Sequence, residues 1–528
     1  MSKFLQSTQT RLYLYPVLAG ICIFLAFETY SFFPVLFLLP FFLNGMRQLS
    51  MRQKLSAYWI MAIVTNLGGF GWIAIVARDF GGLPPVAAFG LLLVFSVFNN
   101  LNFPLWAYLE RFFGEKSSPF MTSVLFCVAE QINPQVFPWY FGTSLDSVFV
   151  LYQVADLFGV IGLSFVAVTI IHIPWWIWQY RKSLLASMKM PLIRQLAFLL
   201  FVVTYGIGAL NKYDNEPRAN RKSVGISLIQ SNTSMEKSYG ARLTAADRFQ
   251  EFQEIVAISK QAIAQHPQRV DLVVWPEGSV HFPILTSQRI REEISTFARE
   301  NGVFLTAGSI EFTNEKHPNG RRIYYNTEFV FNPMGEVAGK YRKIVLLAFG
   351  EYMPFLNTFP IIEEWLPETI ANFTRGTEKP LFAIRENLHW LPLICYEDII
   401  SGFMNGFDHR QADFMVNITN DGWFGKTDAS HLHKQMARPR TVEYRKPIVR
   451  ALNTGSSQII DAAGRTISRE TDQYTREFIN ITLNLPEKPS VTLYSIIGNW
   501  PIYLLIAAVA AFWVRKRLLG NADILQEG

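Results

Sequence analysis

The stretch WLPLICYE, residues 390–397, is an apolar run that ends abruptly in Cys395, Tyr396 and Glu397. A short, continuous apolar run of this kind is typical of a buried β-strand. Such a strand would deliver Cys395 to the edge of a sheet, where a side chain can react. A lone cysteine at a strand end is more often a buried core thiol. The interpretation of Cys395 as a nucleophile therefore depends on its compartment and its partners.

Two other segments have the same form. The run VVWPE, residues 273–277, ends in Glu277, and VAGKYRK, residues 337–343, ends in Lys343. A thiol that attacks a carbonyl group needs a base for its proton and a positive charge where the oxyanion develops. Glu277 can act as the base, because poor solvation raises the pKa of a carboxylate toward neutrality. Taken singly, Glu277 also fits a surface turn and Lys343 a solvated edge.

The three segments lie in a block, residues 223–486, whose pattern predicts a soluble α/β domain. Apolar residues recur at helical spacing between residues 249 and 263, and turn signals stand at residues 332–335 and 462–464. Strand-like runs occur at residues 271–275, 303–307, 325–331, 391–394, 414–418, 457–461 and 478–485. A block of this length is ample for one hydrophobic core.

The chain as a whole is too apolar for a soluble protein, since half of its 528 residues are hydrophobic and 15% are aromatic. Eight apolar segments are predicted to cross a bilayer. They are residues 12–26, 32–43, 57–76, 85–109, 120–129, 157–178, 195–210 and 497–514. Seven form an N-terminal membrane domain, residues 1–212, and the eighth is a C-terminal helix. The first segment has no small-residue cleavage site behind it, which predicts a retained anchor.

Basic residues in the short loops predict the topology. With eight spans, one side of the membrane receives Lys3, Arg11, Arg47, Arg52, Lys54, Arg111, Lys116, Arg181, Lys182, Lys189, Arg194, Arg515, Lys516 and Arg517. The short loops opposite hold essentially Arg78 alone. Because basic loops stay in the cytoplasm, both termini are predicted to be cytoplasmic and the α/β block to lie outside. The net charge of +6 thus indicates a membrane partner and no nucleic acid.

This topology places Cys395 in an oxidising compartment. Cys22 and Cys127 fall within predicted spans, so neither can pair with it. An unpaired thiol in such a compartment favours catalysis over a structural role.

Glu277, Lys343 and Cys395, in this order and context, resemble the Glu-Lys-Cys triad of the carbon-nitrogen hydrolase (nitrilase) superfamily. Nearly the whole chain resembles the bacterial apolipoprotein N-acyltransferases. The motifs that carry the resemblance are WPE (275–277), FGEY (349–352), ICYE (394–397), NDGWFG (420–425), QMAR (435–438), RALNTG (450–455), FPW (137–139) and GVIGLSF (159–165).

The resemblance implies a four-layer α-β-β-α sandwich in the periplasm, attached to a polytopic helical bundle of about eight spans in the bacterial inner membrane. It implies that Cys395 takes an acyl chain from a membrane phospholipid as a thioester. The chain would then pass to the α-amino group of the N-terminal diacylglyceryl-cysteine of an apolipoprotein, the last step of lipoprotein maturation. No cofactor and no metal are expected.

The resemblance also implies roles for single residues. Lys343 would stabilise the oxyanion and Glu277 would shuttle the proton. Glu351 matches a second carboxylate that holds the lysine. Further matches, expected to line or support the pocket, are Tyr396, Glu397 and Trp423.

The chain departs from the family pattern at a few positions. Ala348 stands where proline is frequent, and Gly422 where alanine is frequent. Ser238 stands where a pocket tryptophan is expected, and residues 131–135 lack the usual arginine-glycine pair. The last two differences bear on substrate fit and not on the triad.

Two other functions remain open from the residues. A membrane-anchored amidase or nitrilase-type hydrolase would use the same triad with water as acceptor, although one span would suffice to anchor it. A polytopic transporter with a degenerate binding domain fits the intact triad poorly and has few ionisable residues in mid-span. His431 and His433 have a spacing that a metal pair can use, but a structural or pocket role is favoured, since no third ligand is well spaced beside them.

Overall fold

The computed structural model describes residues 7–27, 30–79, 81–113, 118–182, 189–215, 221–233, 244–317, 322–348, 350–352 and 372–526. The chain divides into two compact units. A helical unit comprises residues 1–74, 86–212 and 492–528, and an α/β unit comprises residues 75–85 and 213–491.

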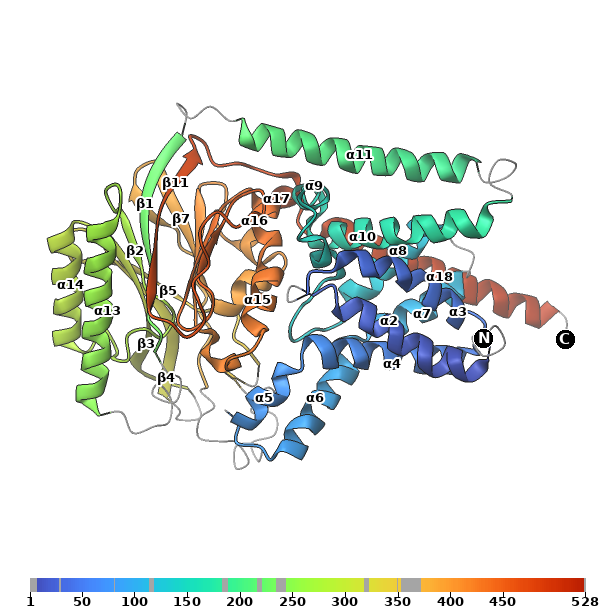
Figure 1. The fold of residues 1–528 in the computed structure, drawn as a ribbon, viewed down its shortest axis with the longest axis horizontal. Helices are drawn as coiled ribbons and strands as arrows, with labels where there is room; N and C mark the ends of the chain where they lie inside the picture. The colour runs from blue at the N-terminus through green and yellow to red at the C-terminus, as the bar shows by residue number, and fades with distance from the viewer. Residues whose placement is uncertain are drawn as a thin grey trace. The chain divides into compact units, whose positions relative to one another are not determined.

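The helical unit is built from apolar helices (Figure 1). The helices in this part of the chain are α2 (Tyr15–Phe24), α3 (Leu39–Met46), α4 (Met51–Gly69), α5 (Trp72–Asp79), α6 (Pro85–Asn99), α7 (Asn102–Phe113), α8 (Pro119–Ile132), α9 (Phe149–Tyr152), α10 (Ala155–Tyr180), α11 (Lys189–Asp214), α17 (Leu493–Ile497) and α18 (Trp500–Gln526). Gly159 interrupts α10 with φ of 66°. A Cβ atom there would lie 2.4 Å from the ring of Tyr494, so packing and backbone both require glycine.

Fewer spans are supported than the sequence predicts. Among the described residues, the helical segments long and apolar enough to cross a membrane are Pro85–Phe113, Ala155–Tyr180 and Ile193–Asp214. A further candidate is the pair Met51–Gly69 and Trp72–Asp79, which is bent by 61°. Shorter apolar helices, Thr10–Phe24, Phe33–Met46 and Pro119–Ile132, coincide with three predicted spans. The number eight and the two-sided topology stay predictions.

The α/β unit contains two sheets. The six-stranded sheet has the order β11-β1-β2-β3-β4-β5, and the five-stranded sheet has the order β10-β9-β8-β7-β6. The strands are β1 (Arg221–Gln230), β2 (Leu272–Val274), β3 (Phe304–Lys316), β4 (Arg322–Phe331), β5 (Val337–Arg342), β6 (Phe382–Arg385), β7 (Leu388–Ile394), β8 (Phe414–Thr419), β9 (Ile448–Leu452), β10 (Gln458–Ile460) and β11 (Glu477–Pro486). Strands β1, β2 and β3 are mutually parallel, as are β7, β8 and β9.

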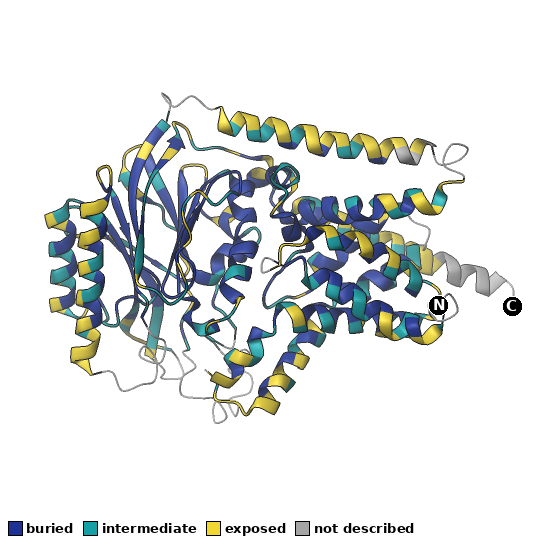
Figure 2. Ribbon diagram, viewed as in Figure 1, coloured by how far each residue is buried: buried dark blue, intermediate teal, exposed yellow. Residues whose placement is uncertain are grey.

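Figure 1 shows four layers in this unit. Helices α13 (Ala245–Gln265) and α14 (Gln288–Asn301) cover the six-stranded sheet, while α15 (Ala429–Ala437) and α16 (Pro439–Tyr444) lie against the five-stranded sheet. Figure 2 shows the strands buried between these helices. Between the sheets, the ring of Trp390 packs against Phe304 of the opposite sheet, with 6.2 Å between ring centroids. The predicted α-β-β-α sandwich is therefore confirmed.

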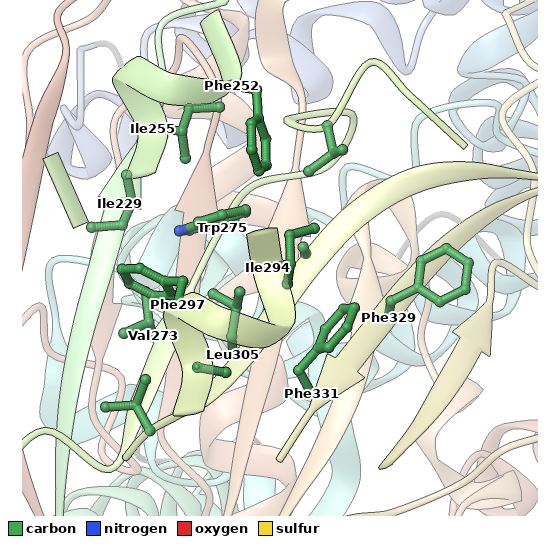
Figure 3. Close-up of a cluster of buried hydrophobic side chains, with 14 of the residues drawn as sticks. Ile229, Phe252, Ile255, Val273, Trp275, Ile294, Phe297, Leu305, Phe329 and Phe331 are labelled. Carbon is green, nitrogen blue, oxygen red and sulfur yellow. The ribbon is translucent and has the colours of Figure 1, made fainter. Parts of the chain in front are cut away.

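A hydrophobic core under α13 and α14 anchors the carboxyl end of β2 (Figure 3). Trp275 is fully buried there between the rings of Phe252 and Phe297. Its indole N–H donates to Ser259 Oγ at 2.8 Å, so the polar atom is satisfied. Burial of a side chain of this size stabilises the fold by about 2 kcal/mol or more. The chain is thus held firmly two residues before Glu277.

All seven predicted strands are present. Their ends are shifted by three residues or fewer, except that β3 continues to Lys316, nine residues beyond the predicted end. The two predicted turns are present as well. The backbone N–H of Gly335 donates to the carbonyl of Asn332, and that of Gly464 donates to the carbonyl of Asp461. The sequence pattern did not predict β1, β6 or β9.

Candidate active site

The three predicted triad residues each follow the carboxyl end of a strand: Glu277 after β2, Lys343 after β5 and Cys395 after β7. The first two strands belong to the six-stranded sheet and the third to the five-stranded sheet. All three side chains are buried. Glu277 and Lys343 both shift the pKa of Cys395, and Cys395 and Glu277 both raise the pKa of Lys343. The structure therefore brings the three together between the two sheets.

Glu277 has both carboxylate oxygens occupied. Oε1 accepts hydrogen bonds from the side-chain amide of Asn326 at 2.6 Å and from Lys343 Nζ at 3.3 Å. Oε2 accepts one from the backbone N–H of Asn420 at 2.8 Å. Burial raises the pKa of Glu277, Lys343 opposes that rise and Glu351 adds to it. A carboxylate with a raised pKa is suited to take a proton and return it.

Glycine on the neighbouring strand allows this placement. A Cβ atom on Gly308 of β3 would lie 2.6 Å from Cα of Glu277 and 2.7 Å from the carbonyl oxygen of Pro276. The backbone around Glu277 is also bonded to β3, because the N–H of Trp275 donates to the carbonyl of Thr306 at 2.9 Å. The loop of the base therefore lies directly on β3.

Lys343 is held between two carboxylates. Its Nζ donates to Glu351 Oε1 at 2.8 Å as well as to Glu277, and the amide of Asn326 also reaches Glu351 Oε1, at 3.0 Å. Burial disfavours the charge on Lys343, but Cys395, Glu277 and Glu351 together raise its pKa well above the usual value. The ammonium group therefore stays charged. The contact of Glu351 with the lysine is the one expected from the sequence.

Cys395 adopts a left-handed backbone conformation, with φ of 53°. A non-glycine residue in this region costs roughly 1–3 kcal/mol, and such strain clusters at functional sites. The residue begins the short 3₁₀ helix η6 (Cys395–Ile399), and its carbonyl accepts from the side chain of Asn417 at 3.2 Å. Burial raises the pKa of the thiol well above its usual value; Glu277 adds to this and Lys343 counteracts it. The resting thiol is thus protonated and needs a base during attack.

Glu397 is fully buried and links the two sheets. Its Oε1 accepts from the backbone N–H groups of Ile344 and Val345 at 2.7 and 3.0 Å. Its Oε2 accepts from the backbone N–H of Ile394 at 2.9 Å and from the hydroxyl of Tyr341 at 2.8 Å. Burial raises the pKa of Glu397 to about 7, although these hydrogen bonds lower it. The carboxylate thereby ties the segment after Lys343 to the residue before Cys395.

The remaining predicted residues lie in short turns. Tyr396 is half-buried in η6, and Trp423 is half-buried in the 3₁₀ helix η8 (Asp421–Phe424). Ser238 lies outside the described residues. Two site residues escaped the sequence analysis, Asn326 and Asn420. The signal for Asn326 was present, since it is a polar residue inside the strand-like run 325–331.

His433 binds two carboxylates. Its Nε2 lies 2.9 Å from Asp398 and its Nδ1 lies 3.0 Å from Asp421. Among the described residues, no group of three or more histidine, cysteine, aspartate or glutamate side chains is arranged to hold a metal ion. The three cysteines, all of them described, are free thiols.

This arrangement can perform acyl transfer through a thiol. A thiol needs a base for its proton and a positive charge for the oxyanion, and a buried carboxylate and a charged ammonium group lie beside Cys395. The ammonium group is held in place by its hydrogen bond to Glu351.

Comparison with known proteins matches the two parts of the chain to two different family models. Residues 226–487 match the carbon-nitrogen hydrolase family. Residues 19–173 match the apolipoprotein N-acyltransferase N-terminal domain.

Full-length relatives agree with both matches. The chain is 29% identical to an apolipoprotein N-acyltransferase of Bdellovibrio bacteriovorus, with 88% of this chain and 86% of the relative covered. It is also 29% identical to an apolipoprotein N-acyltransferase of Geobacter metallireducens, with 96% of each chain covered. Among solved structures, an amidase from Nesterenkonia shares 19% identity over 50% of this chain and 91% of its own, with a TM-score of 0.35.

Proposed function

Because this chain belongs to the apolipoprotein N-acyltransferase family, we propose that it transfers a fatty acyl chain from a membrane phospholipid to apolipoproteins. The acceptor is the α-amino group of the N-terminal diacylglyceryl-cysteine. The observation that carries the proposal is the combination, in one chain, of a buried Glu-Lys-Cys site with the N-terminal domain of these acyltransferases.

The first half-reaction forms a thioester. Glu277 takes the thiol proton while Sγ of Cys395 attacks the carbonyl carbon of the phospholipid ester. Lys343 stabilises the oxyanion. When the intermediate collapses, the carbon–oxygen bond to glycerol breaks, Glu277 returns the proton to that oxygen, and a lysophospholipid leaves.

The second half-reaction forms an amide. The neutral α-amine attacks the thioester carbonyl, and Lys343 again stabilises the oxyanion. Glu277 takes a proton from the nitrogen and gives it to the departing sulfur, so Cys395 and Glu277 return to their starting states. Glu351 keeps Lys343 in place throughout, Glu397 positions the segments on both sides, and Tyr396 and Trp423 line the pocket.

The apolar helices support a lipid donor and a lipidated acceptor. Both substrates would enter sideways from a bilayer, and a multi-pass unit offers a route for this that a single anchor lacks. We place the protein in the bacterial inner membrane with both termini in the cytoplasm and the α/β unit in the periplasm. The basic residues of the predicted short loops support this orientation.

A two-stage labelling experiment tests the proposal. The full-length protein in detergent is incubated with phospholipid that carries a labelled acyl chain, and a diacylated lipopeptide with a free N-terminal amine is then added. We expect hydroxylamine-sensitive label on the protein that moves to the peptide amide and is absent in Cys395→Ser. Label that is lost equally fast to water without peptide would favour an amidase-type or nitrilase-type hydrolase. Absence of label on the wild-type protein would refute the proposal.

A further inference from the structure

His433 connects two turns that the proposed reaction depends on. The residue lies on α15, and its two ring nitrogens bind Asp398 of η6 and Asp421 of η8 at 2.9 and 3.0 Å. All three side chains are at least nine-tenths buried. Because the ring of His433 is hydrogen-bonded to both turns, it fixes their separation.

Each of these turns carries one part of the candidate active site. Turn η6 begins at Cys395 itself. Turn η8 directly follows Asn420, whose backbone N–H holds Oε2 of Glu277 at 2.8 Å. Asp398, His433 and Asp421 therefore form one chain of contacts between the turn of the thiol and the loop of the base.

A second contact leads from the same cluster to the nucleophile. The side-chain amide of Asn417 donates both to Asp398 Oδ2 and to the carbonyl oxygen of Cys395. A shift of Asp398 would therefore reach the strained backbone of Cys395 by two routes, along η6 and through Asn417.

The charges of the cluster balance only while His433 is protonated. Arg450 Nε donates to Asp398 Oδ2 at 3.0 Å, so two carboxylates face one guanidinium and one imidazole. Burial lowers the pKa of His433, but Asp398 and Asp421 raise it to about 9 against the repulsion of Arg450. Without that positive charge, one of the two aspartates would be an uncompensated buried anion, which is strongly unfavourable.

We propose that His433 is a positioning residue for acyl transfer, which holds the turn of Cys395 and the loop of Glu277 at the separation that proton transfer requires. The inference takes the reaction from the proposed function of the site, whereas the contacts of His433 come from the structure and do not depend on that function. The competing explanation is an ion cluster that stabilises the fold and has no influence on the reacting groups.

The test compares His433→Gln with His431→Gln, a half-buried residue on the same helix. Two rates are measured: single-turnover thioester formation from labelled phospholipid, and alkylation of Cys395 by iodoacetamide, with Cys395→Ser as the blank. We expect both rates to fall at least about tenfold in His433→Gln, the equivalent of one charged hydrogen bond. The KM for the lipopeptide and the rates of His431→Gln should stay within about twofold. Unchanged rates in a folded His433→Gln would overturn the proposal.

A pair of double variants separates positioning from charge balance. His433→Gln with Asp421→Asn, and His433→Leu with Asp421→Asn, both restore a neutral cluster, but only glutamine can bridge the two turns. We expect the glutamine pair to recover most of both rates and the leucine pair to stay about tenfold slow, as loss of a well-placed contact predicts. Equal recovery in both would show that charge balance suffices, and the proposal would be wrong. This comparison also stands if His433→Gln alone does not fold.

The alkylation rate keeps the two proposals apart. If the wild-type protein takes no label from phospholipid, the proposed function fails, while the order of alkylation rates still decides the role of His433.

Discussion

Glu277 and Glu351 share the same two donors, because Oε1 of each carboxylate accepts hydrogen bonds from Lys343 and from the side-chain amide of Asn326. Two buried carboxylates in contact with one ammonium would leave an excess negative charge. The neutral amide offers a donor to both without adding a charge of its own. It also lowers the pKa of Glu277, against burial and against Glu351.

Replacement of Asn326 should shift the pH dependence of acylation. The side-chain amide of Asn326 lowers the pKa of Glu277, so that pKa should rise in Asn326→Leu. The carboxylate then stays protonated to higher pH, and the acid limb of the rate profile moves to higher pH. A shift of about one pH unit is expected from the loss of one such hydrogen bond, and with it a rate about tenfold lower on the acid limb of the profile. The measurement is single-turnover thioester formation between pH 5 and 9. Asn480→Leu, in the same sheet but outside the site, serves as the control, and coincident profiles would contradict the prediction.

A methyl group on Gly308 should disable the base without touching the thiol. In Gly308→Ala the new Cβ would lie 2.6 Å from Cα of Glu277, so the backbone of Glu277 must move. Displacement of a catalytic group by about 1 Å costs on the order of 100-fold in rate. The same substitution at Gly90, where a Cβ meets no atom within 4 Å, should leave thioester formation unchanged. Wild-type rates in Gly308→Ala would mean that the loop of Glu277 does not depend on contact with β3.

The hydrogen-bond donors around Glu397 predict that two substitutions lower the stability of the protein by different amounts. Glu397→Gln replaces one accepting oxygen by an NH₂ group that faces two donors, so both the thermal midpoint and the acylation rate should fall. Tyr341→Phe removes one donor and leaves three, and a loss of about 1–3 kcal/mol is expected. Thermal unfolding of the full-length protein in detergent gives the order of the midpoints: wild type, Tyr341→Phe, then Glu397→Gln. A Glu397→Gln protein as stable as wild type would contradict this interpretation of the contacts.

The stability of the α/β unit should fall with rising pH because of His433. Its pKa is raised to about 9 in the folded protein, by the facing Asp398 and Asp421 and against Arg450. The unfolded value is about 6.5. The stabilisation is therefore complete below pH 6.5 and is lost as pH rises through 9, a change of roughly 3 kcal/mol. Thermal midpoints from pH 6 to 10 should decline less steeply in His433→Gln than in wild type, and parallel curves would exclude this linkage.

Much of the α/β unit is predictable because its strands are continuous apolar runs between clear turn signals. Strand β9 escaped prediction for a physical reason: Arg450 stands in its middle, and only the folded protein supplies Asp398 as its partner. The helical unit was harder to predict, since hydropathy finds apolar segments but does not say where a helix bends or stops. The pair α4 and α5, bent by 61°, covers what reads as one span at residues 57–76.

The run KYRK, residues 340–343, shows where sequence patterns lose resolution at the site. Lys340 and Arg342 alternate along β5 onto one face, where both bind Glu311. Tyr341 points to the opposite side and reaches Glu397. Lys343 stands just past the strand end and is buried between two carboxylates. Charge alone does not distinguish these three basic residues, but strand alternation and the position of the strand end do.

The packing of the two sheets against each other predicts how activity is lost when the protein is heated or denatured. The base and the ammonium group stand on one sheet and the thiol on the other, so the distance between base and thiol depends on how the two sheets pack. Heat, denaturant or a smaller residue at Trp390, which leaves a cavity beside Phe304, would loosen this packing before the strands unfold. Loss of acyl transfer should therefore report loosened packing between the sheets before circular dichroism reports loss of helix and strand. On heating, the activity should disappear some degrees below the melting transition.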